Sequence, residues 1–201
     1  MLDLFFSIAV LIFSVVIHEV SHGAVAYALG DSTAKYEGRL TLNPLPHLDP
    51  FGSMLLPFLT YLLGGFIIGW AKPVPYNPHN LSNQRWGPAL VGAAGPGANI
   101  LIALLFSLIL RIFGENFPEP LISILATIIL INILLAFFNL VPIPPLDGSK
   151  VLFALLPAGL YRLQLFLEEY GFFVLLLFIF FFWRYLSPLV FFFFRILVGA
   201  N

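Results

Sequence analysis

Apolar residues occur along this chain in long runs, separated by short polar segments that are rich in proline. Three runs, at about residues 4–29, 88–113 and 121–140, are each long enough to cross the ~30 Å hydrocarbon core of a bilayer as a helix. A further run starts at Gly171 and is interrupted at Arg184 and Pro188. The pattern predicts an all-α polytopic membrane protein with about four to five transmembrane helices.

The apolar stretch Phe51–Trp70 differs from these runs, because Pro57 and three glycines interrupt it. We expect it to form a re-entrant or broken segment, which a membrane tolerates where protein or water satisfies the backbone. The polar stretch before it contains Arg39–Leu42, whose alternation of polar and apolar side chains predicts a possible short β element within residues 36–50.

The C-terminal part of the chain resumes after a proline-rich turn. Ser149–Tyr170 carries charged residues among apolar ones, which predicts an amphipathic or interfacial helix ahead of the last span. We therefore expect residues 1–201 to form a single membrane-embedded domain. Its sequence motifs fall within residues 17–148, and the interfacial helix and last span within residues 149–201.

Composition agrees with a membrane protein and limits the chemistry. Hydrophobic residues make up 60% of the chain and charged residues 9%, and the mean hydropathy is +1.00. The formal net charge of -1 gives no reason to expect nucleic acid as a partner. Because the chain has no cysteine, a metal ion would have to be held by His, Asp, Glu or Asn side chains.

The first apolar run contains His18, Glu19 and His22. At positions i and i+4 of a helix, the two histidines lie on one face and can bind the same metal ion. Glu19 lies at the edge of that face, where it suits a general base better than an equivalent third ligand. Such groups are costly inside a membrane span unless they have a function, although a polar contact between helices would also account for them.

Two further motifs follow in the chain, Ala94–Asn99 in one apolar run and Asn139–Gly148 after the next. Together with the histidine motif, and in this order, they resemble the signature of the site-2 protease family of intramembrane zinc metalloproteases. The resemblance extends over residues 17–148, and it is to the minimal members of the family, without a PDZ or CBS domain.

The resemblance implies one catalytic zinc ion held by His18, His22 and Asp147, with Glu19 as the catalytic base. It also implies that Asn139 is a catalytic residue, which orients the substrate or its scissile carbonyl. Taken alone, Asp147 in its Pro-Pro-Leu-Asp-Gly context also fits a turn, and Asn139 also fits a hydrogen bond between helices.

Three more residues are candidates for binding the substrate, namely Asn43, His47 and Asn99. His47 and its neighbour Asp49 could support the metal ligands or form an edge that presents the substrate, and a surface turn is the alternative. Asn99 could hydrogen-bond near the metal or only pack between helices.

A shared metal ion also constrains the topology. If every apolar segment crossed the membrane, Asp147 would emerge opposite His22, so we expect Phe51–Trp70 not to cross. The alternative is that Arg39–Pro50 dips back through part of the membrane. The acidic loop at Glu115 and Glu119 then lies on one side of the membrane. Six basic residues lie on the other side: Lys35, Arg39, Lys72, Arg85, Lys150 and Arg162. This asymmetry predicts a zinc site toward the cytoplasmic side of a prokaryotic cell membrane.

The sequence therefore predicts an intramembrane zinc metalloprotease that hydrolyses peptide bonds in or near transmembrane segments of membrane proteins, within the lipid bilayer. The alternative is a non-proteolytic membrane protein that binds metal, either a metal transporter or an inactive relative of the protease. A transporter should carry ionisable residues along a path through the membrane, and an inactive relative should lack Glu19 or a ligand. The sequence leaves the oligomeric state open.

Overall fold

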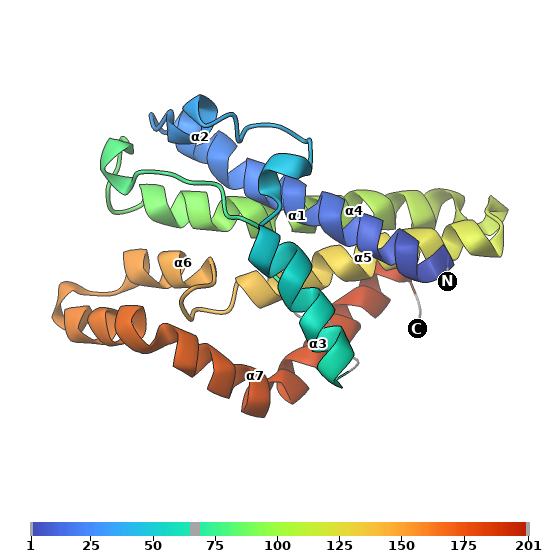
Figure 1. Cartoon of the computed structure of the whole chain (residues 1–201). Coiled ribbons are helices and arrows are strands. Elements are labelled where there is room, and N and C mark those ends of the chain that lie inside the picture. Colours follow the sequence, from blue (N-terminus) through green and yellow to red (C-terminus); the bar gives the residue numbers. More distant parts are fainter. Residues whose placement is uncertain (1, 65–68, 200–201) are drawn as a thin grey trace.

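Long helices make up most of the computed structural model, which describes residues 2–64 and 69–199 (Figure 1). Four of these helices contain a stretch that is long and apolar enough to cross a membrane. They are α1 (Leu2–Ala28), α4 (Gly87–Phe113), α5 (Glu119–Asn139) and α7 (Tyr161–Val198). The predicted class, an all-α polytopic membrane protein, is confirmed.

The central helix is α4, because it contacts α1, α5, α7 and the short helix α6 (Gly148–Leu155). Helices α4 and α5 run antiparallel and are joined through the short turn η4 (Gly114–Asn116). Aliphatic side chains fill the space between α4, α5 and the end of α7; the buried ones are Ala103, Leu110, Leu125, Ile129, Ile133 and Val190. The outer faces expose many large apolar side chains, as expected of helices that lie in lipid.

The C-terminal helices have other bounds than the sequence suggested. The expected helix Ser149–Tyr170 is divided into α6 and the start of α7, and a short 3₁₀ turn, η5 (Ala158–Leu160), lies between them. Pro157 has no backbone N–H and favours this break. The expected interruption at Arg184 and Pro188 lies inside α7, which changes direction in its later part in Figure 1, as a proline within a helix explains.

Arg111 and Ser107 of α4 hold the end of α7. The Ser107 hydroxyl donates to the Leu197 carbonyl at 2.6 Å, and the Arg111 guanidinium donates to the carbonyls of Leu197 and Ile196. These carbonyls belong to the last turn of α7, where no further helical N–H can reach them. The C-terminal end of α7 therefore lies beside the turn that joins α4 to α5.

The stretch Phe51–Trp70 forms a short helical element where the structure describes it. A π-helical turn, η2 (Pro50–Leu55), leads directly into α3 (Leu56–Gly64), and residues 65–68 lie outside the described part of the chain. Residues 50–64 reach about 22 Å at the helical rise of 1.5 Å per residue, which is less than the ~30 Å of a hydrocarbon core. A short, broken element agrees with the prediction that this stretch does not cross. Figure 1 shows α3 leading away from α1 and α4.

The possible β element within residues 36–50 is wrong, since this fully described segment contains no strand. It contains the end of α2 (Thr33–Tyr36) and the 3₁₀ turn η1 (Leu45–His47) instead. Its polar groups bond locally: the Arg39 N–H donates to the carbonyl of Ala34, and the Asn43 N–H to the hydroxyl of Thr41. Such local bonds compete with the ladder that a strand would need.

Asp31, just after α1, fastens that helix to a turn far along the chain. Its carboxylate is fully buried and accepts from the Asn77 N–H at 2.7 Å, the Asn80 side chain at 2.9 Å and the Thr33 hydroxyl at 2.6 Å. Asn77 precedes the 3₁₀ turn η3 (Pro78–Asn80). Burial alone would raise the pKa of Asp31, but these hydrogen bonds outweigh it and lower the pKa below its ordinary value.

Candidate metal centre

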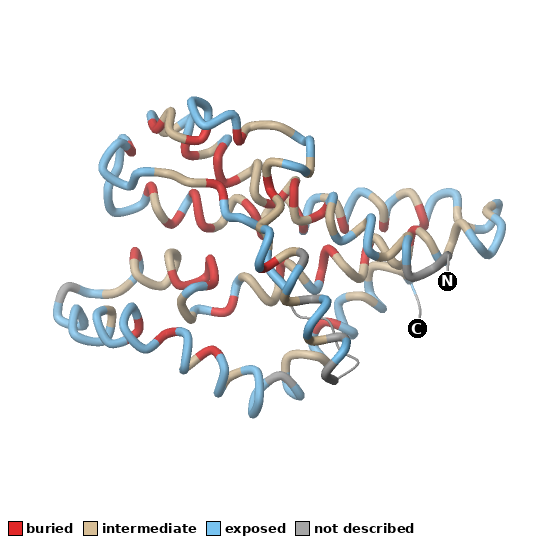
Figure 2. Tube along the Cα trace, viewed as in Figure 1, coloured by how far each residue is buried: buried red, intermediate tan, exposed pale blue. Residues whose placement is uncertain are grey.

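His18 and His22 lie one turn apart on α1, in the half of the helix that leads to Ala28. The two residues are 5% and 6% exposed, and the ring centroids are 4.6 Å apart with the planes nearly perpendicular. Figure 2 shows that buried positions gather where this half of α1 meets the beginning of α4. The helix spacing thus brings both imidazoles to one buried face.

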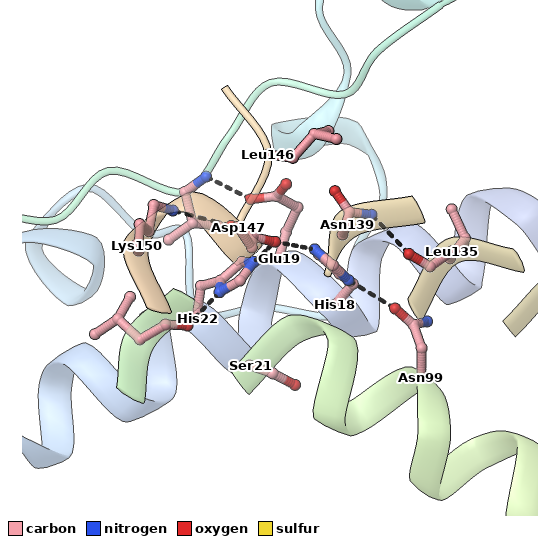
Figure 3. A network of polar contacts seen from close by, with 12 residues as sticks. His18, Glu19, Ser21, His22, Asn99, Leu135, Asn139, Leu146, Asp147 and Lys150 are labelled. Atoms are coloured by element: carbon pink, nitrogen blue, oxygen red, sulfur yellow. Dashed lines mark hydrogen bonds and ion pairs between the residues drawn. The ribbon is translucent and has the colours of Figure 1, made fainter. Parts of the chain in front are cut away.

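Asp147 meets these rings from 129 and 125 residues further along the chain. Its Oδ2 atom lies 3.0 Å from His18 Nε2 and 3.1 Å from His22 Nε2 (Figure 3). Asp147 precedes α6, and the prolines before it prevent α5 from continuing. A Cβ on Gly148 would overlap the Leu140 carbonyl, so the Asp-Gly pair lets the chain turn back against the end of α5.

Hydrogen bonds on the far side of each ring fix its tautomer. His18 Nδ1 lies 2.6 Å from the side-chain oxygen of Asn99, and His22 Nδ1 lies 2.6 Å from the Val91 carbonyl. Both partners only accept, so each Nδ1 carries the hydrogen and donates it. In the neutral ring, the Nε2 atom is then the free lone pair, and in both rings it faces Asp147.

Three acceptor atoms therefore converge at one buried point. The two Nε2 atoms and a carboxylate oxygen lie within 4.8 Å of one another. The Lys150 ammonium lies 2.9 Å from Oδ1 of Asp147 and favours the ionised form of this carboxylate. Such atoms repel one another unless a cation lies among them or extra protons are taken up. Two imidazole nitrogens and one carboxylate oxygen match the donors of a catalytic zinc site.

Glu19 lies beside this cluster, and a backbone group holds it (Figure 3). Its Oε2 atom accepts a hydrogen bond of 2.7 Å from the N–H of Val74, in the segment after α3. Arg39 positions the same segment: it is 4% exposed and donates to the carbonyls of Lys72 and Pro73. This segment therefore contacts the Glu19 side chain and is fixed in place by Arg39.

The other candidates from the sequence are placed differently. Asn139, at the end of α5, lies near the cluster in Figure 3 and donates to the Leu135 carbonyl at 2.9 Å. Asn43 is exposed, and its side chain accepts from the Leu45 N–H. His47 is buried and contacts the Thr41 carbonyl. The structure brings Asn99 to the metal-binding face as the partner of His18, and it leaves Asn43 and His47 in a local turn.

Sequence reasoning missed some groups that contact this centre. Lys150 donates to Asp147 Oδ1 at 2.9 Å, and its spacing of three residues on α6 could have indicated the pair. Asn132 bonds the Asn99 side chain at 2.8 Å, and an amide in the middle of an apolar run was the available signal. The Val74 N–H has no signature in the sequence, because every residue except proline carries one.

Comparisons with known proteins agree with this geometry. The sequence profile described as peptidase family M50 matches residues 6–122 and 114–182. YwhC of Bacillus subtilis is 42% identical over 173 residues, which are 83% of this chain and 76% of YwhC. Rip2 of Mycolicibacterium smegmatis is 34% identical over 69% of this chain and 52% of its own length. MJ0611 of Methanocaldococcus jannaschii is 31% identical over 73% of this chain and 72% of its own length.

All three relatives carry names that assign them a zinc metalloprotease activity by inference. No solved structure matches the chain. The profile match covers most of the sequence, and it includes the histidine motif of α1 and the Asp147 turn. This chain is a member of peptidase family M50, the site-2 protease family of metalloproteases.

Proposed function

We propose that this protein is an intramembrane zinc endopeptidase, which hydrolyses peptide bonds in or near transmembrane segments of membrane proteins. The observation that carries the proposal is the depth of the three-acceptor centre with Glu19 beside it. His18 lies about 15 Å and His22 about 9 Å before the end of α1, at 1.5 Å per residue. With α1 spanning the bilayer, the reacting groups would lie within its thickness, where a transmembrane segment is the accessible substrate.

His18, His22 and Asp147 would hold the zinc ion, and their three donors leave a position for water. When bound, zinc would supply a water that ionises at about pH 7, and the ion itself would polarise the peptide carbonyl. The chain's own contribution begins with rigid ligands, because hydrogen bonds at Nδ1 and the proline-rich turn hold all three in place.

Glu19 is the proposed general base. Its carboxylate accepts a proton from the attacking water and returns it to the leaving nitrogen, so both proton transfers use one group. The Val74 N–H holds Oε2 and thereby limits rotation of the side chain. Asn139 is the proposed group that orients the scissile carbonyl, since its side-chain amide carries a second N–H besides the one bonded to Leu135. Asn43 and His47 stay proposed substrate contacts in the turn before α3.

The membrane orientation is also part of the proposal. The end of α1 and the beginnings of α4 and α6 lie at one end of the molecule, and the turn after α4 lies at the other (Figure 1). The first end carries most of the basic residues outside the spans, and the second carries Glu115 and Glu119. The positive-inside rule then directs the metal centre toward the cytoplasm of a prokaryotic cell.

The test compares purified wild type with Glu19→Gln, using metal analysis and cleavage of a synthetic transmembrane peptide in proteoliposomes. We expect cleavage to be lost in the variant while one zinc ion per chain is kept, because the base acts on water and not on the metal. Glu37→Gln, at an exposed position, is the matched control and should cleave like wild type. Undiminished cleavage by Glu19→Gln would remove Glu19 from the mechanism, and zinc binding without any wild-type cleavage would favour a non-proteolytic metal-binding protein.

A further inference from the structure

A group of buried polar side chains lies beside the metal centre, on the side away from the Ala28 end of α1. Ser14 of α1, Asn99 of α4 and Asn132 of α5 come from three different helices, and all are at most 4% exposed. An amide in a hydrocarbon interior is costly unless every donor and acceptor is paired. The contacts of these residues therefore show what each amide is able to do.

The contacts form a chain of hydrogen bonds that ends at His18. The Asn132 amide donates to the Ile128 carbonyl and to the Ser14 hydroxyl, both at 2.9 Å. The Asn99 amide donates to Asn132 Oδ1 at 2.8 Å and to the Ser14 carbonyl at 3.3 Å. Asn99 Oδ1 then accepts from His18 Nδ1 at 2.6 Å.

The direction of these bonds is fixed at the end that is far from the metal. A backbone carbonyl only accepts, so the Ile128 carbonyl requires the NH₂ group of Asn132 on its side. Asn132 then presents its side-chain oxygen to Asn99, and the NH₂ group of Asn99 donates to that oxygen. The oxygen of Asn99 is left for His18, so His18 carries its hydrogen on Nδ1 and offers Nε2 toward Asp147.

The two histidines differ in this respect. The partner of His22 is the backbone carbonyl of Val91, which can only accept a hydrogen bond. A side-chain amide holds His18, and it would present NH₂ to the ring if it rotated by half a turn. Two acceptors oppose this rotation because each requires the Asn99 NH₂ group on its side: the Ser14 carbonyl at 3.3 Å and the Asn132 oxygen at 2.8 Å, which makes the shorter contact.

We propose that Asn132 is a positioning residue for the metal-binding ring of His18, acting through the orientation of Asn99. The inference rests on the proposed zinc site, and it assigns to Asn132 a role beyond joining α5 to α4. A residue that only joined helices would need hydrogen bonds but no particular direction. The direction is what the experiment has to test.

The experiment measures zinc affinity of the full-length protein in detergent, by competition with a chelator of known affinity. Asn132→Leu should weaken zinc binding about 10-fold or more, the range found when groups supporting metal ligands are lost. The control is Ser107→Ala, which removes another buried hydroxyl contact between helices, away from His18, and should leave zinc affinity unchanged. Asn132→Ser serves if the leucine variant does not fold. A hydroxyl donates as readily as it accepts, so it should weaken zinc binding in the same direction.

A second background separates positioning from stability. Aspartate at position 99 accepts on both oxygens, so its orientation no longer matters. Asn132→Leu should therefore weaken zinc binding beside Asn99 but not in an Asn99→Asp background, a coupling that a double-mutant cycle measures. Equal weakening in both backgrounds, or an affinity of Asn132→Leu within about twofold of wild type, would overturn the positioning role.

The failure of this inference differs from the failure of the proposed function. His18→Ala removes a proposed ligand and should abolish tight zinc binding whatever Asn132 does. If His18→Ala binds zinc like wild type, the metal centre itself is misassigned. If His18→Ala loses zinc and Asn132→Leu does not, only the role of Asn132 fails.

Discussion

A single methyl group added at Gly95 should disable the metal centre without disturbing the helix that carries it. Gly95 lies on α4, directly beneath the histidine rings. A Cβ built there lies 2.5 Å from Nε2 of both His18 and His22. Ordinary contacts of this kind begin at 3.4 Å, so each ring nitrogen would have to move by about 1 Å, or α4 would have to move away.

The magnitudes decide the expected result of Gly95→Ala. Alanine in a helix interior is normally favoured over glycine by about 1 kcal/mol, which partly offsets an overpacking cost of about 1 to 3 kcal/mol. The protein should therefore stay folded. Metal coordination is less tolerant, because ligand distances have to hold within about 0.2 Å. We expect zinc affinity to fall about 10-fold or more and cleavage to fall with it.

Gly97→Ala provides the matched control, because it makes the same change two residues further along α4. A Cβ at Gly97 meets nothing within 4 Å, so this variant should keep zinc, activity and thermal stability. Zinc per chain, chelator competition and far-UV circular dichroism are measured on both. Wild-type zinc affinity in Gly95→Ala would refute the close packing of α4 beneath the rings.

Three other predictions follow from the same structure. Asp147→Asn should lose most zinc affinity and cleavage, while Asp49→Asn, which alters a carboxylate that caps η2, should keep both in metal analysis and peptide cleavage. Asp31→Asn should lower the free energy of unfolding by about 2 kcal/mol, since the NH₂ group of the new amide would face the N–H donors of Asn77 or Asn80. Folding lowers the pKa of this carboxyl, so the difference in unfolding free energy between wild type and Asp31→Asn should be full above about pH 4 and vanish as the pH falls through the lowered pKa. Thermal melts in detergent over this pH range measure the difference. Cysteines placed at the exposed Lys72 and Glu115 should react with an impermeant reagent from opposite sides of the membrane, Lys72 from the cytoplasm; reaction from the same side would contradict the proposed orientation.

Residue type and spacing predicted the two histidines of the candidate metal centre. His18 and His22 follow from helix geometry alone, because an i, i+4 pair shares a face in any helix. Asp147 required the family resemblance, since nothing local to a Pro-Pro-Leu-Asp-Gly turn indicates a contact with α1. Long apolar runs likewise predicted α1, α4 and α5 nearly to their ends, because hydrocarbon thickness limits what such runs can do.

The features that the sequence did not predict depend on contacts between segments that are distant in the chain. Alternation at Arg39–Leu42 suggested a strand, but the buried Arg39 side chain bonds carbonyls of the segment after α3 instead. A long polar side chain that reaches across to another backbone has the same sequence pattern as one that faces solvent. The contact between the Val74 N–H and Glu19 could not be predicted either, because a backbone donor is present in every residue except proline.

The Asp31 hydrogen bonds bear on how chains of this design can vary in length. They join the end of α1 to the turn at Asn77, so the segment between residues 32 and 76 begins and ends at nearly the same place. Doubling the length of such a closed excursion costs only about 0.6 kcal/mol in loop entropy. Insertions and deletions around α3 should therefore be tolerated between homologues, provided that they spare the segment at Val74, and the loop can diversify while the metal centre stays constant.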